Sequence, residues 1–147
     1  MTDINFYVSK QDGLESRFRI AYKLIGYALK RNLFIHIHTD NEEMNKQIND
    51  WLWTFDKSSF IPHCIITQTD DANKKTEIKE TITISHDYEP MENCDYLINL
   101  SIQRPAFFSR FSKLAEIIDN SEEILAAGRK RYVFYRERGY TLAYHKL

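Results

Sequence analysis

The sequence has 147 residues, of which 43% are hydrophobic, which suits one compact domain with an apolar core. Its formal net charge of -1 excludes a global electrostatic attraction to nucleic acid or to an anionic membrane, so such binding would need a local patch. Two distant cysteines exclude a disulfide framework and no apolar run approaches a membrane span, so we expect a cytoplasmic protein with a single domain over 1–147.

The first half of the chain predicts two strand–helix pairs. Apolar and polar residues alternate in the strands, and apolar residues recur at i, i+3, i+4 and i+7 in the helices. Asp12-Gly13 separates the members of the first pair, and Asp40 and Asn41 offer N-caps to the second helix. The expected elements are strands at 4–8 and 33–39 and helices at 14–31 and from 40 to about 53.

The second half predicts short strands followed by two helices. Pro105 suits the first turn of a helix, and apolar residues up to Ile118 recur at helical spacing. Ser121 precedes two glutamates and opens another helix, which ends near Gly139. The expected elements are strands at 65–66, 81–85 and 96–100, an exposed loop at 67–79, helices at 105–118 and 121–139, and an edge strand at 140–144.

This alternation of strands and helices is typical of a three-layer α/β fold, in which helices cover both faces of a mostly parallel sheet. Such folds often bind nucleotides through glycines that let the backbone approach phosphates. The four glycines here are isolated and form neither GxGxxG nor GxxxxGK[ST]. A nucleotide-binding α/β enzyme therefore remains an alternative that no sequence motif supports. We expect no cofactor.

His36 and His38 lie two residues apart on a predicted strand and so share a face. They could offer two ligands to a metal, with a third from His63 or Cys64. Because no H-E-x-x-H motif accompanies them, we expect them to line a half-covered strand instead. No GxSxG motif and no recognisable carboxylate pair is present, so we expect no catalytic residues.

An aromatic segment at 51–63 places bulky apolar side chains where loops are usually polar. It contains Trp53, Phe55, Phe60 and Pro62. These side chains either fold back onto the core or form a surface for a partner protein, since aromatic residues dominate such interfaces.

A basic and aromatic segment at 128–140 combines five cations with one acid and four aromatic residues. It lies within 104–147, where nine Lys and Arg against five Asp and Glu give a local net charge of about +4. At helical spacing Arg129, Tyr132, Val133 and Arg136 share one face, which fits an acidic peptide with a hydrophobic end. The cations also suit the end of a helix dipole. Direct contact with nucleic acid is a further use, and makes a stand-alone single-strand-binding module an alternative.

Several motifs resemble the chi subunit family of bacterial DNA polymerase III, in their order and separation. Together they cover the chain nearly end to end. The motifs are Phe6-Tyr7, Leu52-Trp53, Ser59-Phe60-Ile61-Pro62-His63, Leu97-Ile98-Asn99-Leu100, Glu116-Ile117-Ile118-Asp119 and Arg131-Tyr132-x-x-Tyr135-Arg136-x-x-Gly139-Tyr140.

The resemblance implies a Rossmann-like subunit that performs no catalysis by itself, because the nucleotidyltransferase activity belongs to another subunit of the complex. It implies pairing with the psi subunit, which joins chi to the clamp loader. Trp53, Phe60 and Pro62 match family positions at the psi surface, which also serves an alternative helicase-like partner. Contact with DNA is then mostly indirect.

The resemblance also implies binding of the acidic C-terminal tail of single-stranded-DNA-binding protein. Arg129 and Tyr132 match family positions in the tail pocket. Leu125 and Val133 stand where some relatives have lysines, so other cations are expected to compensate. The expected tail-binding residues are Arg129, Lys130, Tyr132 and Arg136.

Overall fold

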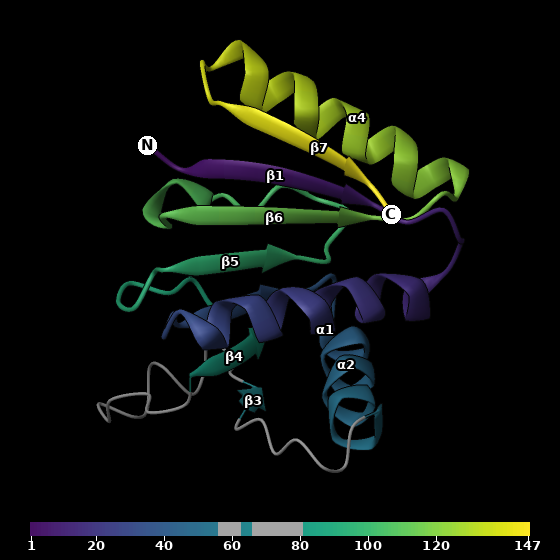
Figure 1. The fold of residues 1–147 in the computed structure, drawn as a ribbon, viewed down its shortest axis with the longest axis vertical. Helices are drawn as coiled ribbons and strands as arrows, with labels where there is room; N and C mark the ends of the chain where they lie inside the picture. The colour runs from purple at the N-terminus through teal and green to yellow at the C-terminus, as the bar shows by residue number, and fades with distance from the viewer. Residues whose placement is uncertain (56–62, 66–80) are drawn as a thin grey trace.

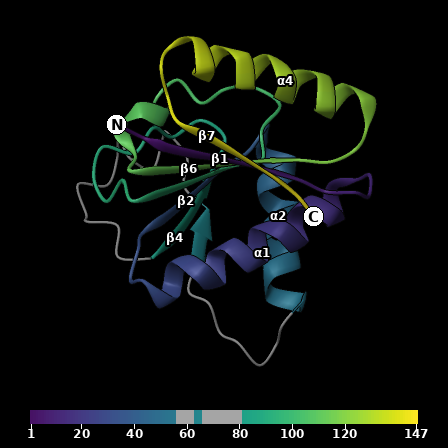
Figure 2. The same ribbon diagram turned by 45° about the horizontal axis from the view of Figure 1, so that its top comes forward.

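The computed structural model describes residues 1–55, 63–65 and 81–147, which form one parallel sheet with helices on both sides (Figures 1 and 2). The strands are β1 (Asp3–Val8), β2 (Ile35–His38), β3 (His63–Ile65), β4 (Ile82–Ser85), β5 (Tyr96–Asn99), β6 (Lys113–Ile118) and β7 (Leu142–Lys146). The helices are α1 (Leu14–Lys30), α2 (Glu42–Phe55) and α4 (Glu122–Glu137), with a 3-10 turn, η1 (Phe108–Arg110).

The strand order is β3-β4-β2-β5-β6-β1-β7, and every pairing among these strands is parallel. The prediction of a mostly parallel α/β sheet is therefore confirmed. β1 lies between β6 and β7, with Phe6 opposite Glu116 on one side and Tyr144 on the other. The predicted edge strand after Gly139 is also confirmed, since β7 ends the sheet.

The helices are distributed over the two faces as the sequence predicts. Figure 2 shows the sheet between α4 on one side and α1 with α2 on the other. The α1/α2 face buries aliphatic residues of the strands, such as Ile35, Ile37 and Ile98, against both helices. Helix α1 begins after Gly13, whose φ of 101° lies in the left-handed region that favours glycine.

The α4 face is lined differently, because about half of its buried apolar side chains are aromatic rings. Phe6, Phe108 and Tyr135 are buried there, and Tyr135 is in contact with both phenylalanine rings. His36 also lies on this face, with its ring near Phe107. The expectation that His36 and His38 share one face of a strand is confirmed.

The predicted helix at 105–118 is wrong. The chain makes only the 3-10 turn η1 and then enters β6, a central strand between β5 and β1. A central parallel strand is buried on both faces and carries a nearly continuous apolar run, whose spacing fits a helix equally well. The family motif Glu116–Asp119 therefore lies on and just after a strand, with Glu116 facing α4.

The expected loop at 67–79 lies outside the described residues. None of the helices in the described part of the chain combines the length and apolarity that a bilayer span requires.

Candidate functional site

A groove of about 360 Å³ runs between α4 and the strands beneath it. Most of its lining is apolar or aromatic, and the Phe6 and Tyr132 rings meet edge to face with centroids 5.3 Å apart. Tyr144 on the edge strand β7 closes the groove opposite Tyr132. The lining residues are Phe6, Ile118, Leu125, Gly128, Arg129, Tyr132, Val133 and Tyr144.

Arg129 is the only charged residue among the described residues that line this groove. Its side chain is exposed and forms no ion pair with a described carboxylate. A guanidinium beside an apolar slot can bind a carboxylate through two N–H groups while the slot takes an apolar side chain. The sequence placed Arg129, Tyr132 and Val133 on one helix face, and the structure brings all three to the groove.

Gly128 sets how closely α4 approaches the sheet. A Cβ atom at this position would lie 2.9 Å from Cδ1 and 3.0 Å from Cγ2 of Ile118, too close for carbon atoms. The groove therefore depends on a glycine in the middle of a helix, where glycine is usually unfavourable. Such an isolated glycine is the sequence signal that could have indicated close packing here.

A buried polar network fixes α4 on the sheet. Glu116 of β6 is fully buried, and its carboxylate lies 3.1 Å from Nε of Arg131, forming an ion pair. Tyr135 Oη donates a hydrogen bond to Glu116 over 2.6 Å, and Asn99 Nδ2 donates another over 2.7 Å. Burial raises the pKa of Glu116, while the charge of Arg131 acts in the opposite direction. Arg131 is thus a structural cation and does not belong to the exposed basic surface.

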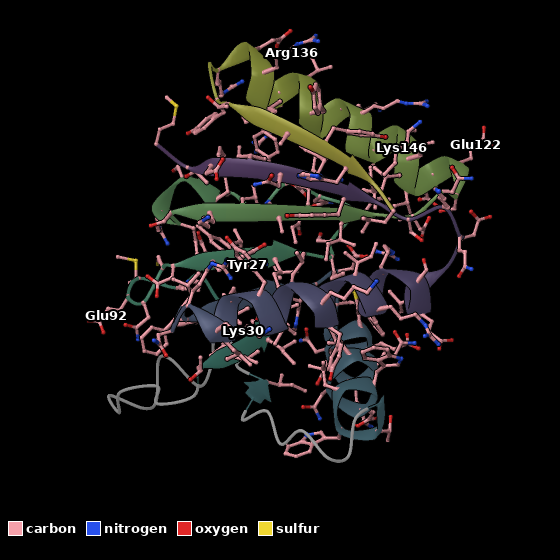
Figure 3. All side chains as sticks on the ribbon, viewed as in Figure 1. Tyr27, Lys30, Glu92, Glu122, Arg136 and Lys146 are labelled. Atoms are coloured by element: carbon pink, nitrogen blue, oxygen red, sulfur yellow. The ribbon has the colours of Figure 1, made fainter. Side chains whose placement is uncertain are left out.

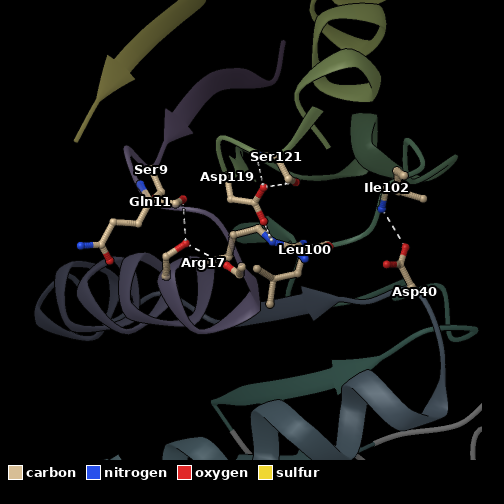
Figure 4. A network of polar contacts seen from close by, with 10 residues as sticks. Ser9, Gln11, Arg17, Asp40, Leu100, Ile102, Asp119 and Ser121 are labelled. Carbon is tan, nitrogen blue, oxygen red and sulfur yellow. Dashed lines mark hydrogen bonds and ion pairs between the residues drawn. The ribbon is translucent and has the colours of Figure 1, made fainter. Parts of the chain in front are cut away.

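A second polar network positions the start of α4, near the carboxyl ends of the strands (Figure 4). Nε of Arg17 on α1 lies 3.1 Å from the Asp119 carboxylate, and both side chains are buried. Arg17 Nη1 also donates to the carbonyl of Leu100 over 3.0 Å. Asp119 in turn accepts a hydrogen bond from the backbone N–H of Ser121, one residue before α4. The two faces of the sheet are therefore linked through one aspartate.

The remaining predicted tail-binding cations, Lys130 and Arg136, are exposed on α4 but are not among the groove-lining residues. Figure 3 shows Arg136 on the outer side of α4, where it points away from the sheet. Leu125 and Val133 do line the groove and make it more apolar. Lys130 and Arg136 therefore lie on α4 outside the groove itself.

The structure describes residues 51–55 and 63 of the predicted partner surface at 51–63. Trp53 is 42% exposed near the end of α2, whereas Trp51 packs against Phe18 and Tyr22 of α1. Phe60 and Pro62 lie outside the described residues. The end of α2 and helix α4 lie at opposite ends of the molecule in both ribbon views (Figures 1 and 2).

A crevice of about 460 Å³ lies at the carboxyl ends of β2, β4 and β5. The connections after β2 and β5 lead to opposite faces of the sheet, an arrangement in which α/β proteins often bind ligands. Asp40 and Glu123 line this crevice, so its carboxylates oppose the binding of a phosphate group. Burial lowers the pKa of His38, which also lines it, to about 4, so this histidine is neutral at pH 7.

His36 is buried beneath the α4 face, where its Nδ1 lies 2.6 Å from the Thr83 hydroxyl. Burial lowers its pKa to about 3, so it is neutral at physiological pH. Within residues 1–55, 63–65 and 81–147 no group of three or more potential metal ligands is present. The geometry assigns His36 to packing of this face.

Comparisons with known proteins agree with the motifs that span the chain. The family described as DNA polymerase III chi subunit, HolC, matches residues 1–143. The DNA polymerase III subunit chi of Pseudomonas aeruginosa is 30% identical over 147 residues, which is 100% of this chain and 98% of the relative. The subunit of the same name from Haemophilus influenzae is 23% identical over 139 residues, 94% of this chain and 92% of the relative. The chain therefore belongs to the family of chi subunits of DNA polymerase III, which serve in DNA replication.

Proposed function

We propose that this chain is a non-catalytic adaptor, with one functional domain over 1–147. One surface binds the psi subunit of DNA polymerase III and so joins the clamp loader. The other binds the acidic C-terminal tail of single-stranded-DNA-binding protein. The adaptor thereby tethers the polymerase to coated single strands and raises their effective concentration for one another.

The observation that carries this proposal is the groove beside α4. It combines the exposed guanidinium of Arg129, which pairs with no carboxylate of the described residues, with an apolar slot of about 360 Å³. This combination suits a peptide that ends in an apolar side chain and a free carboxylate. Specificity would come from both parts, since the slot selects the last side chain and Arg129 selects the terminal charge.

The distance between the two candidate surfaces supports the adaptor role. Trp53 is exposed in the last turn of α2, and the end of this helix lies at the opposite end of the molecule from α4 (Figure 1). Two partners on these surfaces would therefore not compete for space. In this proposal Trp53, with Phe60 and Pro62, contacts psi or an alternative helicase-like partner. Arg129 and Tyr132 contact the tail, with Lys130 and Arg136 adding attraction.

Fluorescence anisotropy with a labelled tail peptide of about ten residues tests the groove. We expect a Kd of about 1 μM that weakens with salt. Arg129→Ala should weaken binding about tenfold to hundredfold, because a charge-assisted hydrogen bond is lost. Tyr132→Ala should weaken it through loss of the slot wall.

A peptide with an amidated C-terminus sharpens this test. Amidation should weaken binding to the wild-type protein but add little to the loss in Arg129→Ala, because both changes remove the same contact. Trp53→Ala and Arg19→Ala are controls on distant surfaces and should bind the tail normally. Equal binding by wild type and Arg129→Ala would contradict the assignment of the tail to this groove.

A further inference from the structure

Helix α4 carries a second basic flank, on the side of the helix that faces away from the groove. Its central feature is the ring of Phe134, with Cζ of Arg104 and Cζ of Arg138 each 3.5 Å from the ring centre. Two guanidiniums at this distance must stack on opposite faces of the ring, because they would overlap on one face. We call Arg104, Phe134 and Arg138 the arginine clamp.

Contacts of both chain segments that contribute to the clamp, the one before η1 and the end of α4, hold its residues in place. The segment before η1 runs beside α4, where Arg131 Nη1 donates a hydrogen bond to the Ile102 carbonyl over 2.6 Å. Phe108 packs edge to face against the Phe134 ring from within the core. Arg138 is the C-cap residue of α4, so its backbone is also fixed. The two cations are therefore presented in a defined geometry.

Both guanidiniums of the clamp are exposed, and neither forms an ion pair with a carboxylate of the described residues. Two like charges at such close range repel each other, and stacking on the ring offsets this only in part. An external anion that contacts both cations would relieve the repulsion. The clamp is thus suited to a partner with closely spaced negative charges.

The chemistry of the clamp favours a nucleic-acid backbone over an acidic polypeptide. Guanidiniums cover both faces of Phe134, so the site offers no apolar slot for a peptide side chain, in contrast to the groove. Arginine N–H groups match phosphate oxygens bidentately, and an exposed guanidinium can also stack on a base. Two cations separated by a ring can contact successive phosphates of one strand.

We propose that the arginine clamp binds the phosphate backbone of single-stranded DNA without sequence preference. The net charge of the whole chain is -1, so binding is weak and salt-sensitive, with a Kd of about 10⁻⁵ M at low salt. This contact is independent of the tail-binding proposal, because no clamp residue lines the groove.

The test is an anisotropy titration of a labelled oligothymidylate of about 16 nucleotides at several salt concentrations. The double variant Arg104→Ala/Arg138→Ala should bind at least about tenfold more weakly. The slope of log K against log salt concentration should decrease by about 1.4, the value for two lost phosphate contacts. The double variant Arg104→Lys/Arg138→Lys keeps both charges but loses the planar guanidiniums that bind phosphate through two N–H groups. It should bind with intermediate affinity.

Arg19→Ala/Arg31→Ala is the matched control, since it removes two exposed arginines elsewhere, one of which stacks on Tyr27. An equal loss in this control, no binding by the wild type at low salt, or a normal affinity in the clamp variant would each overturn the proposal. If the clamp variant bound DNA normally but lost affinity for an acidic peptide, the clamp would be a peptide site and the proposal would be overturned. If Arg129→Ala did not change the affinity for the tail peptide, the tail-binding proposal would fail but the proposal for DNA binding at the clamp would not.

Discussion

The two faces of the sheet are covered in different ways. Under α1 and α2 the buried layer is mainly aliphatic, with Phe18 and Tyr96 as its aromatic members, and Ile37 and Ile98 are fully buried in it. Under α4 the layer mixes aliphatic side chains with many more aromatic rings, and it encloses buried polar groups, among them Glu116, Arg131 and His36. Apolar contacts stabilise without direction, whereas hydrogen bonds and ion pairs need a defined geometry.

This difference matches the positions of the two candidate surfaces. The groove needs Arg129 and Tyr132 at fixed places above β1 and β6, so a rotation of α4 would disrupt it. The network of Glu116, Arg131 and Tyr135 resists such a rotation. We infer that the α1/α2 face supplies mainly stability, and that the α4 face also sets the orientation of the binding helix.

Lowering the pH should have the largest effect that distinguishes the two faces, because the histidines His36 and His38 both lie on the α4 side. Their pKa values are lowered to about 3 and about 4 by burial, so the unfolded state binds more protons below pH 6.5. The contribution of the two neutral histidines to the free energy of unfolding is therefore fully present above pH 6.5. It is lost as the pH falls toward their folded-state pKa values. We expect a loss of roughly 5 kcal/mol between pH 6.5 and 4, measured by urea unfolding.

The variant His36→Leu should remove about half of this pH dependence, and His36→Leu/His38→Leu nearly all of it. His145→Gln serves as a control, because His145 is exposed on the edge strand β7. An unchanged slope in the double variant would show that these two histidines do not carry the acid response.

The ion pair beneath α4 should come next in size. Glu116→Ala leaves Arg131 buried without its carboxylate and should cost about 3–5 kcal/mol of unfolding free energy. It should also weaken tail binding by the folded protein, since α4 loses its fixed orientation. Ile98→Ala on the other face should cost about 2–5 kcal/mol and leave tail affinity unchanged.

The double variant Glu116→Leu/Arg131→Met sharpens the distinction. An apolar pair of similar volume should restore much of the stability but not the tail affinity. Full recovery of both would contradict the orienting role of the network.

The smallest expected effect concerns the spacing between α4 and the sheet. Gly128→Ala places a methyl group against Ile118 and should cost about 1–3 kcal/mol, read as a lower urea midpoint. Gly26→Ala in α1 meets no atom within 4 Å and should instead stabilise the protein by up to about 1 kcal/mol. Ile118→Val should relieve part of the Gly128→Ala cost, because it removes the carbon at 2.9 Å. Additive effects of these two changes would argue against the close contact.

The three helices α1, α2 and α4 and most of the strands were predictable from the sequence alone. β6 was not, because a strand buried on both faces loses the alternation that identifies strands. The helix predicted in its place also hid the role of Glu116, which only the sheet brings under Arg131 and Tyr135.

The candidate site was predictable only in its helical part. Arg129, Tyr132 and Val133 follow from helical spacing, and they meet in the groove. Phe6 and Tyr144 reach it from strands far away in the sequence, so no local pattern could place them there. The clamp escaped prediction for the same reason, because Arg104 lies about thirty residues from its ring.

The position of β1 also has a consequence for folding. In a growing chain this strand emerges early, but its two neighbours are β6 and β7. One of its hydrogen-bonding edges must therefore wait for β6 and the other for β7, while β2, β4 and β5 can pair earlier. Such non-local pairing slows folding and leaves unpaired edges open to aggregation. Truncation before Leu142 would return one edge of β1 to that exposed state permanently.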